Sequence, residues 1–439
     1  MLSNQVLYPS RGTRGLLVMS LYVRRLCSTL PRPHGSPLLC RVGVGGVRWA
    51  AGSSQGSSSI PRWRKHAKLV TLGFGVGAIV GGGYMYDIYK KVTTPLANPS
   101  EGGDYILHHK PPTFNPARKI QIPTDSTGLK ITLFQYQTCP FCCKVRAFLD
   151  YYGFSYDVIE VNSVTRTQTR WTDYRKVPFA VVELPGLDTV LQLKDSTMII
   201  SVLLSFLHNK TESLQDLMKC FPTVAYTDEE GEKRIEIMNR YFLMYGQHPP
   251  GRSKEDIVEE RKWRKWVDDV LVHVLSPNVY RTPKEAFQAF QWFSKVGNWE
   301  EHFATWERLL VVYVGAAAMF VIGKNLKRRH QLKDDVRLSF YEETNVWLKA
   351  LRKKGTNFMG GDQPNLSDLA VYGVLTAVEG CEAFRDLRQN TRISQWFDRM
   401  TEVVKHHGGA TLTQERGNME HKEDQHSSDI VNVSSSQTQ

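Results

Sequence analysis

The chain has 439 residues, 41% of them hydrophobic, which is enough for two domains with additional tails. Its formal net charge is +12, but residues 1–86 contain eleven Lys or Arg and no Asp or Glu, so 45 basic and 44 acidic residues remain in residues 87–439. The part of the chain that can fold is therefore nearly neutral, and this distribution of charge argues against a nucleic-acid-binding protein.

The N-terminal region has the features of a targeting segment followed by a membrane helix. Residues 1–68 are rich in Arg, Ser and Gly, which is typical of organellar targeting segments. Residues 69–86 carry no charge and are just long enough to cross a bilayer core as a helix. Their glycines are similar to those of a dinucleotide-binding loop, but no strand pattern precedes them, and a glycine-rich membrane helix explains them better. We therefore predict a membrane segment at residues 69–86, joined by a Pro-rich linker, residues 87–128, to the folded domains.

Residues 129–209 alternate between strand and helix patterns. The predicted strands are residues 130–136, 154–161, 176–186 and 189–193, and the predicted helices are residues 140–152, a short polar helix or loop at 163–174, and 195–209. This order, β-α-β-α-β-β-α, predicts a small mixed sheet with helices on its faces. It is the arrangement of a thioredoxin-like (glutaredoxin-like) domain.

Strand patterns stop after Asn209, and the remainder of the chain reads as helical. We predict a charged connector at 210–255, an all-helical domain at 256–405 and a disordered tail at 406–439, which is almost without large apolar residues. The fold class is thus α+β followed by all-α. The expected helices are one with an apolar face at 267–274 that ends before Pro277, and others at about 284–295, 299–329, 333–353 and 366–383.

Two details refine the helical domain. The apolar run 309–322 is too short to span a membrane and is predicted to be a buried core helix. Asn365 and Asp368 have the spacing of a capping box, which predicts the start of a helix at this point.

Three of the seven cysteines, Cys139, Cys142 and Cys143, lie within "TCPFCCKV". A structural zinc site needs four ligands, usually in two separated pairs, and no second CxxC or HxxxH occurs, so we predict no metal site. The cysteines are also too few and too clustered for a disulfide framework, which indicates a reducing compartment.

Cys139 is the predicted reactive thiol. It follows a strand and stands where a helix begins, with Pro140 at the favoured first helical position. Unpaired N–H groups and the helix dipole stabilise a thiolate at such a place. Cys142, three residues further on, is a possible resolving thiol, whereas Cys143 has no predicted role.

The motifs "YQTCPFC", "KVPF" and "LKDS" resemble the glutaredoxin-like half of a glutathione transferase-type fold. The resemblance implies that Val177, ahead of a cis-Pro178, pairs through its main chain with the cysteinyl part of glutathione. It also implies that Asp195 and Ser196, at the start of the next helix, hold the γ-glutamyl end, and a helix N-terminus does suit a carboxylate.

The runs "LFQYQTCPFC", "SPNVYRTP", "VGAAAMF" and "FMGGDQPNLSDLAVYGVL" resemble the membrane-associated prostaglandin E synthase type 2 family over about residues 100–405. The resemblance implies a homodimer that isomerises prostaglandin H2 to prostaglandin E2, with glutathione as bound cofactor or activator. It further implies attachment to Golgi membranes through the N-terminal segment, with a clipped form in the cytoplasm. The composition of that segment favours mitochondria instead, and both locations stay open.

For this reaction the resemblance implies that the Cys139 thiolate attacks the endoperoxide, with Tyr136 as hydrogen-bond donor to the thiol or the developing alkoxide. Phe141 is expected to line the apolar pocket and to contact glutathione. The resemblance also implies that haem can bind together with glutathione and divert the reaction to cleavage of the endoperoxide. The expected contacts, with haem or with the carboxylate of the lipid, are His273, Lys324 and Arg329.

Two other functions remain open. A glutaredoxin-like thiol–disulfide oxidoreductase would need both Cys139 and Cys142, whereas the isomerase needs Cys139 alone. A non-catalytic membrane adaptor with a transferase fold would lose its thiols without consequence.

Overall fold

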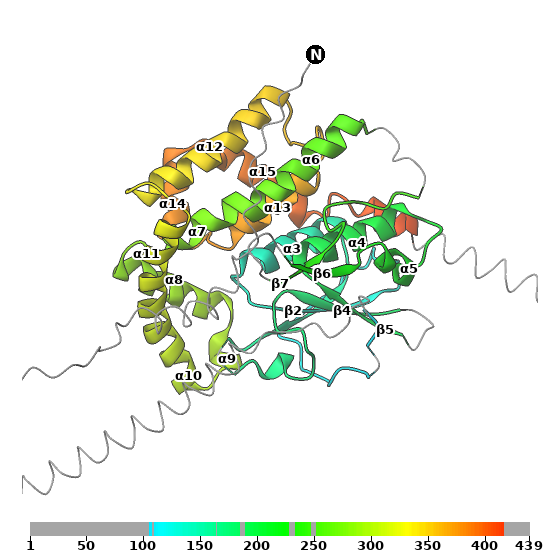
Figure 1. Ribbon diagram of the computed structural model, residues 1–439, viewed down its shortest axis with the longest axis horizontal. Coiled ribbons are helices and arrows are strands. Elements are labelled where there is room, and N and C mark those ends of the chain that lie inside the picture. The colour runs from blue at the N-terminus through cyan, green and yellow to red at the C-terminus, as the bar shows by residue number, and fades with distance from the viewer. Residues whose placement is uncertain are drawn as a thin grey trace, which may run out of the picture. The chain divides into compact units, whose positions relative to one another are not determined.

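The computed structural model describes residues 105–107, 109–163, 165–184, 189–227, 233–246 and 252–416, all of which belong to one compact unit (Figure 1). The predicted targeting segment, the membrane segment at 69–86 and residues 417–439 of the predicted tail lie outside these ranges.

A five-stranded mixed sheet forms the first half of the described chain. Its strands are β1 (Arg118–Ile120), β2 (Lys130–Gln135), β3 (Tyr156–Glu160), β4 (Phe179–Glu183) and β5 (Val190–Lys194). They lie in the order β1-β3-β2-β4-β5, with β2 and β3 parallel and the other pairs antiparallel. The central strand β2 buries Ile131 and Leu133 on one face and Phe134 on the other, because both faces are covered.

Helices α3 (Pro140–Tyr152) and α4 (Ser196–His208) pack side by side on one face of this sheet (Figure 1). Between β3 and β4 the chain forms only a 3₁₀ turn, η1 (Thr167–Thr169), where a short helix or loop was expected. On the other face, Phe134 and Phe179 stack at 4.5 Å and are covered by aromatic side chains of the connecting loops, among them Phe114 and Trp171. The prediction of a thioredoxin-like domain is confirmed.

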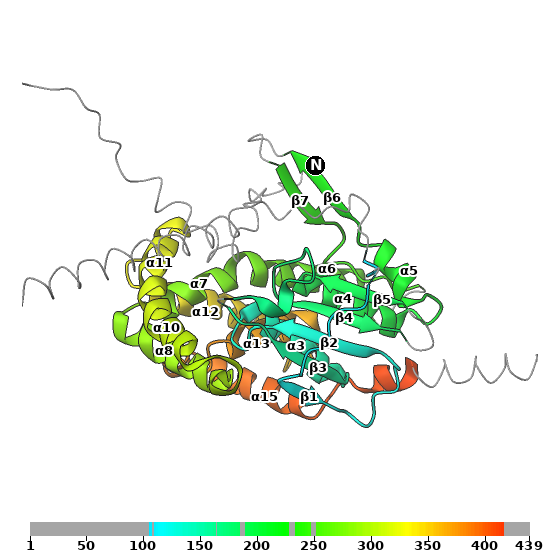
Figure 2. The ribbon, with the colours of Figure 1, turned by 90° about the horizontal axis from the view of Figure 1, so that it is seen from below.

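The connector contains structure that the sequence analysis did not expect. After α5 (Leu214–Lys219), strands β6 (Thr223–Thr227) and β7 (Lys233–Ile237) pair as an antiparallel hairpin, which stands apart from the five-stranded sheet in Figure 2. The prediction that strands stop after Asn209 is therefore wrong. The hairpin leaves Val224 and Ile235 exposed, so its strands lack the pattern of one buried and one polar face by which strands are recognised in a sequence.

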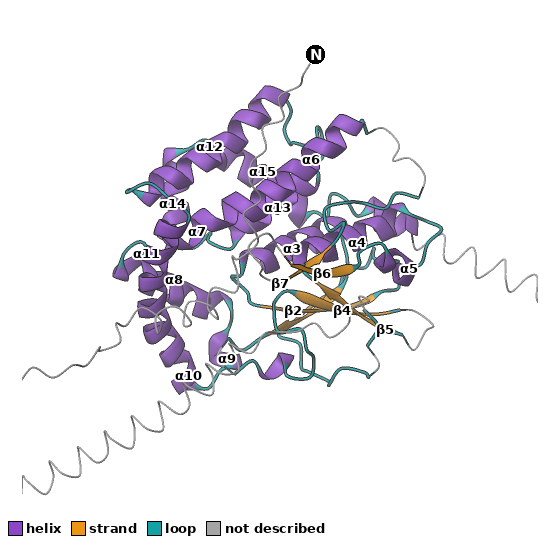
Figure 3. Cartoon of the chain, in the orientation of Figure 1, coloured by secondary structure: helices purple, strands orange, loops and turns teal. Residues whose placement is uncertain are grey.

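Every further element is helical, as the prediction of an all-helical second domain requires (Figure 3). The first group comprises α6 (Lys254–Trp266), the π-helical turn η2 (Val267–Leu271), α7 (Val272–Val279), α8 (Pro283–Val296), α9 (Trp299–His302), α10 (Thr305–Leu310) and the π-helical turn η3 (Val311–Gly315). The second group comprises α11 (Ala316–Arg329), α12 (Val336–Lys354), α13 (Leu366–Thr376), α14 (Glu382–Asn390) and α15 (Ile393–Lys405).

Three predicted boundaries in this domain are wrong. Helix α7 does not stop before Pro277 but runs on to Val279, because the proline lies in the last turn, where few backbone bonds remain to be lost. The helix expected at 299–329 is interrupted at Phe303, and the one expected at 366–383 ends at Thr376 before α14 begins.

The helical run Thr305–Arg329 is long and apolar enough to cross a membrane, the one such helix among the described residues. It packs along one side against α7 and α8. The prediction of a buried core helix is thus half right, since one side is buried and the other exposes a stripe of apolar side chains. We call this stripe the 306–321 face: Trp306, Leu309, Leu310, Tyr313, Val314 and Val321.

Residues 406–416, the beginning of the predicted disordered tail, are ordered. Residues 411–416 are helical, the Thr413 hydroxyl donates to the carbonyl of Tyr152 at 2.9 Å, and Arg416 donates to the carbonyl of Asn209 at 2.9 Å. The prediction of disorder is therefore wrong for residues 406–416. These polar residues are ordered by hydrogen bonds to the first domain, which a composition argument does not see.

Helix α13 lies directly against α3, the helix that follows Cys139. At Gly373 a Cβ atom would lie 2.5 Å from the Cα of Lys144 and 2.8 Å from the carbonyl oxygen of Cys143, so only glycine permits this approach. Asn365 and Asp368 form the predicted capping box at the start of α13. The two domains are thus in main-chain contact immediately behind the cysteine cluster.

Candidate active site

Three predicted site segments meet at one edge of the five-stranded sheet. Cys139 follows the end of β2, Pro178 immediately precedes β4, and Asp195 immediately follows β5. Phe134 pairs with Phe179, and Phe179 pairs with Lys194, so the end of β2, the start of β4 and the end of β5 are neighbours. The register of the sheet therefore brings together residues that are up to 56 positions apart in the chain.

Cys139 is the N-cap residue of α3, with Pro140 at the first helical position. Its N–H donates to the carbonyl of Tyr136 at 3.1 Å, and its carbonyl accepts the N–H of Cys143 at 2.9 Å. The sulfur thus stands at the N-terminus of the helix, held by main-chain bonds on both sides.

The pKa of Cys139 lies below that of an ordinary thiol. The largest cause is a hydrogen bond from the Cys142 side chain, which outweighs the opposing effect of burial, and the N–H groups of Cys142 and Phe141 and the charge of Arg146 add to it. Burial raises the pKa of Cys142 itself well above the usual range. The pKa values of the two thiols are thus shifted in opposite directions, which favours ionisation of Cys139 and leaves Cys142 as its hydrogen-bond donor.

Tyr136 lies just beyond β2 and packs with its ring against the Phe134–Phe179 cluster. Burial raises its pKa, and the negative charge of Cys139 raises it further, so the phenol stays protonated. Within the described part of the chain no hydrogen bond joins the phenol of Tyr136 to the sulfur of Cys139, so its expected role as a donor requires a small movement or a bound substrate.

The predicted glutathione residues have the expected local geometry. The Val177–Pro178 peptide bond is cis. The Asp195 carboxylate caps α4, accepting from the N–H groups of Thr197 at 2.8 Å and Met198 at 3.2 Å. Asp195 has a φ of +67°, a conformation that L-residues rarely adopt and that is often kept at functional sites.

Behind the cysteines, an ion pair that the sequence analysis missed joins the two domains. The Lys144 Nζ of α3 lies 2.5 Å from Oδ1 of Asp268 in the π-helical turn η2, and both side chains are almost fully buried. Oδ2 of Asp268 accepts the hydroxyls of Thr197 at 2.7 Å and Tyr241 at 3.0 Å. Although burial opposes ionisation, Lys144, the Thr197 hydroxyl and the charge of Arg240 lower the pKa of Asp268. A single carboxylate thus connects α3, α4 and the helical domain.

Comparisons with known proteins identify relatives of this chain. The Glutaredoxin family model matches residues 131–183. Prostaglandin E synthase 2 of Danio rerio is 43% identical over 285 residues, which cover 64% of this chain and 72% of the relative. Prostaglandin E synthase 2 of Mus musculus is 45% identical over 288 residues, which cover 65% and 73%.

The chain belongs to the prostaglandin E synthase 2 family.

Solved structures of glutathione transferases are similar at lower identity. Glutathione transferase F7 from Populus trichocarpa is 10% identical with a TM-score of 0.35, over 64% of this chain and 99% of that one. Glutathione S-transferase I from maize is 12% identical with a TM-score of 0.35, over 65% and 98%.

In this member of the prostaglandin E synthase 2 family, the three residues expected to contact haem have different surroundings. The His273 ring stacks on that of His330 with centroids 4.3 Å apart, and Arg329 acts electrostatically on both imidazoles. The Lys324 ammonium lies instead over the ring of Phe320, 4.4 Å from its centroid. The described residues contain no cluster of three or more metal-ligating side chains.

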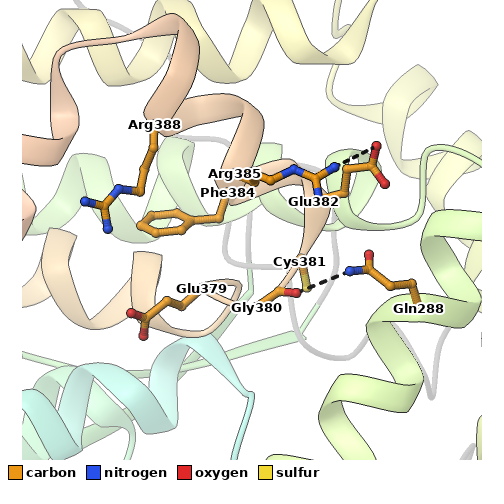
Figure 4. A pocket seen from close by; sticks show the side chains of 8 residues that line it. All are labelled: Gln288, Glu379, Gly380, Cys381, Glu382, Phe384, Arg385 and Arg388. Atoms are coloured by element: carbon orange, nitrogen blue, oxygen red, sulfur yellow. Dashed lines mark hydrogen bonds and ion pairs between the residues drawn. The ribbon is translucent and has the colours of Figure 1, made fainter.

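A cavity of about 360 Å³ lies elsewhere in the helical domain of this chain, between α8 and the start of α14 (Figure 4). None of the predicted site residues lines it. Burial raises the pKa of Cys381, at its wall, to about 12, so this thiol stays protonated. The cavity is therefore separate from the chemistry predicted at Cys139.

Proposed function

We propose that this chain is a prostaglandin E synthase that isomerises prostaglandin H2 to prostaglandin E2 with the thiolate of Cys139. Its membership of the prostaglandin E synthase 2 family supports the reaction. The observation that carries the residue assignment is the state of the thiol pair, in which Cys139 has a lowered pKa and Cys142 remains its hydrogen-bond donor.

The reaction needs a nucleophile that is recovered unchanged. The thiolate attacks the endoperoxide oxygen borne by the carbon that becomes the ketone, an S–O bond forms, and the O–O bond breaks. The other oxygen leaves as an alkoxide and takes a proton. Loss of the C–H proton then forms the C=O bond and returns the S–O electron pair to sulfur. One ketone and one hydroxyl result, with no net oxidation or reduction.

Two groups are suited to deliver the proton to the alkoxide. Cys142 is protonated and already donates to Cys139, and Tyr136 is a protonated phenol within electrostatic range of both thiols. A donor aimed at the developing negative charge lowers the barrier.

The residues present fit glutathione. Among the described residues, the main-chain N–H and C=O of Val177 make no hydrogen bond, so they are available to pair with a peptide-like ligand. Asp195 and Ser196 begin α4, whose N-terminus suits a carboxylate, and Phe141 stands beside Cys139. Glutathione would be held by these residues and would supply a thiol that keeps Cys139 reduced.

Nothing in the arrangement of His273, Lys324 and Arg329 specifies haem, so no step is assigned to it.

The assembly and location are part of the proposal. An N-terminal membrane segment at 69–86 would attach the enzyme to the Golgi membrane, with a clipped cytoplasmic form, and the acid-free composition of residues 1–68 keeps mitochondria as the alternative. A homodimer would cover the exposed 306–321 face, which is apolar enough for an interface between copies. Light scattering on Val314→Glu, which places a charge in that face, should then report a monomer.

A second candidate is a glutaredoxin-like thiol–disulfide oxidoreductase. The specific observation in its favour is that Cys139 and Cys142 are already in hydrogen-bond contact, as a nucleophilic and a resolving thiol would be.

One experiment separates these functions. The full chain is prepared as Cys139→Ser and Cys142→Ser, and each variant is assayed with prostaglandin H2 and with a glutathione mixed disulfide. The isomerase requires that only Cys139→Ser abolish prostaglandin E2 formation, because serine at 142 still donates a hydrogen bond. Loss of prostaglandin E2 formation in both variants would favour a mechanism that needs both thiols. Activity that survives Cys139→Ser would show that Cys139 is not the nucleophile. A non-catalytic adaptor predicts no activity in the parent protein.

A further inference from the structure

The turn that leads into Cys139 is held by a cluster of buried and half-buried polar side chains, which we call the turn clamp: Gln135, Gln137, Cys143, Arg146 and Glu160. Gln137 lies in the turn, two residues before Cys139. Its N–H donates to Oε1 of Glu160 at 2.5 Å, and its carbonyl accepts Nη2 of Arg146 at 2.8 Å. Both main-chain polar groups of Gln137 are thus hydrogen-bonded to side chains from other elements.

Cys143 donates a second hydrogen bond to the same carbonyl. Its Sγ lies 3.4 Å from the carbonyl oxygen of Gln137, to which it donates, and 3.1 Å from Nη2 of Arg146, from which it accepts. The side chain is 2% exposed, and burial raises its pKa, so it is a protonated thiol and able to donate. These contacts are those of a hydrogen-bonding group and not of a nucleophile.

The remaining members close the cluster. Nη1 of Arg146 donates to Oε1 of Gln135, whose Nε2 donates to Oε2 of Glu160 at 3.1 Å and to Oε1 of Gln137 at 3.1 Å. Gln135 and Glu160 are buried. A buried network in which the members are paired rigidifies its surroundings, whereas one unpaired member is costly.

We propose that Arg146 and Cys143 are positioning residues for the reaction at Cys139. By holding the carbonyl of Gln137, they fix the turn that presents the sulfur at the N-terminus of α3. Arg146 does so while placing a positive charge beneath the thiolate. A displacement of about 1 Å at a reacting group can cost about 10²-fold in rate, so such a clamp has a direct kinetic consequence. This inference rests on the proposed role of Cys139 as nucleophile.

Two substitutions at Cys143 separate positioning from the other roles open to a third thiol. Cys143→Ser keeps a donor and an acceptor, whereas Cys143→Val keeps a similar volume and has neither. Positioning predicts that valine is much worse than serine. A redox role predicts that both fail equally, and a simple packing role predicts that valine is tolerated.

Arg146→Met removes the charge and the three hydrogen bonds to Gln135, Gln137 and Cys143, and Arg146→Lys restores the charge with a single donor nitrogen. If Arg146 both positions the turn and supplies a positive charge, Arg146→Lys should retain part of the reactivity that Arg146→Met loses.

The decisive measurement is the rate of alkylation of Cys139 by iodoacetamide as a function of pH in the full chain, with the modified residue identified by peptide mass spectrometry. Because the charge of Arg146 is the smallest of the causes that lower the pKa of Cys139, we expect Arg146→Met to raise the alkylation midpoint by about half a pH unit and, with the loss of positioning, to slow the reaction about fivefold at neutral pH. Cys143→Val should lower kcat for prostaglandin E2 formation about tenfold at unchanged KM, and Cys143→Ser less than about threefold. Cys220→Ser, at an exposed thiol, is the control and should behave as the parent protein.

A Cys143→Val variant with parent kinetics overturns the inference, as does a Cys143→Ser variant that loses as much as valine, or an Arg146→Met variant with an unmoved midpoint. Should Arg146→Met fail to fold, Arg146→Lys takes its place, with an expected loss of about threefold, and a parent alkylation rate then counts against the clamp. Alkylation does not involve the endoperoxide. A parent protein that makes no prostaglandin E2 would therefore contradict the proposed function and leave the alkylation comparison to decide the clamp.

Discussion

Two cysteines of this chain occupy the same kind of position and have opposite chemistry. Cys139 is the N-cap residue of α3 and Cys381 that of α14, and both are nearly buried, at 6% and 3% exposed. Yet the pKa of Cys139 is lowered, whereas burial raises that of Cys381 to about 12.

The difference lies in what faces each sulfur. Cys139 receives the Cys142 thiol, two N–H groups and the charge of Arg146. Near Cys381 the charge of Arg337 is compensated by Glu285, with which it forms a buried ion pair. A helix N-terminus alone is therefore not sufficient to activate a thiol, and donors must be supplied by neighbouring side chains.

The largest expected effect tests this comparison directly. Cys139→Ser should lower the rate of prostaglandin E2 formation by about 10³-fold or more, because it removes the proposed nucleophile. Cys381→Ser should change the rate by less than about twofold. Assays of prostaglandin E2 formation from prostaglandin H2 on both full-length variants check the pair, and similar losses in both would contradict the distinction between the two thiols.

The ion pair behind Cys139 gives the next largest effect. Lys144→Met leaves Asp268 charged and buried, and should lower the free energy of unfolding by about 3–5 kcal/mol in urea titrations. The double variant with Asp268→Asn should recover part of this loss, because no buried charge remains. Lys130→Met, which breaks the exposed pair with Glu183, is the matched control and should cost less than about 1 kcal/mol.

His208 resembles Cys381 in that its pKa is shifted mainly by burial. Burial is the largest cause that lowers the pKa of His208 to about 4. Because the unfolded chain binds this proton near pH 6.5, the contribution to stability is complete above pH 6.5 and is lost as the pH falls to about 4. We expect about 2–3 kcal/mol for this loss, allowing for partial solvent screening. Thermal unfolding of His208→Gln between pH 7 and 4 should show a correspondingly weaker dependence, and an unchanged slope would rule out His208 as its source.

The smallest effect concerns the donor that distinguishes Cys139. Cys142→Ala removes the main hydrogen bond to the thiolate, which should raise the pKa of Cys139 by about one unit, or about 1.4 kcal/mol. The alkylation rate of Cys139 near pH 7 should fall about tenfold, and Cys142→Ser should retain most of it. Equal rates in the two variants would show that the hydrogen bond is not the cause of the low pKa.

Features that depend on residues close together in the sequence were predicted, whereas features that depend on distant residues were missed. The start of α3 at Cys139–Pro140, the start of α4 next to Asp195 and the capping box of α13 follow from residues within four positions of each other, and all three were predicted. The β6–β7 hairpin was missed because its exposed apolar side chains hide the strand period. The packing of residues 406–416 was missed because it depends on hydrogen bonds to residues more than 200 positions away.

By itself the sequence determined which thiol stands at a helix N-terminus, since a strand, a cysteine and a proline in succession leave little conformational choice. It also determined the order of the elements and hence the two-domain fold. Only the tertiary structure decided which charges surround that thiol. Arg146 reaches the carbonyl of Gln137 nine positions back, and Lys144 meets Asp268 124 positions away. Local steric preference specifies the position of the sulfur, whereas the charge of Arg146 reaches it only in the folded first domain. The buried Lys144–Asp268 pair behind it forms only when the two domains pack together.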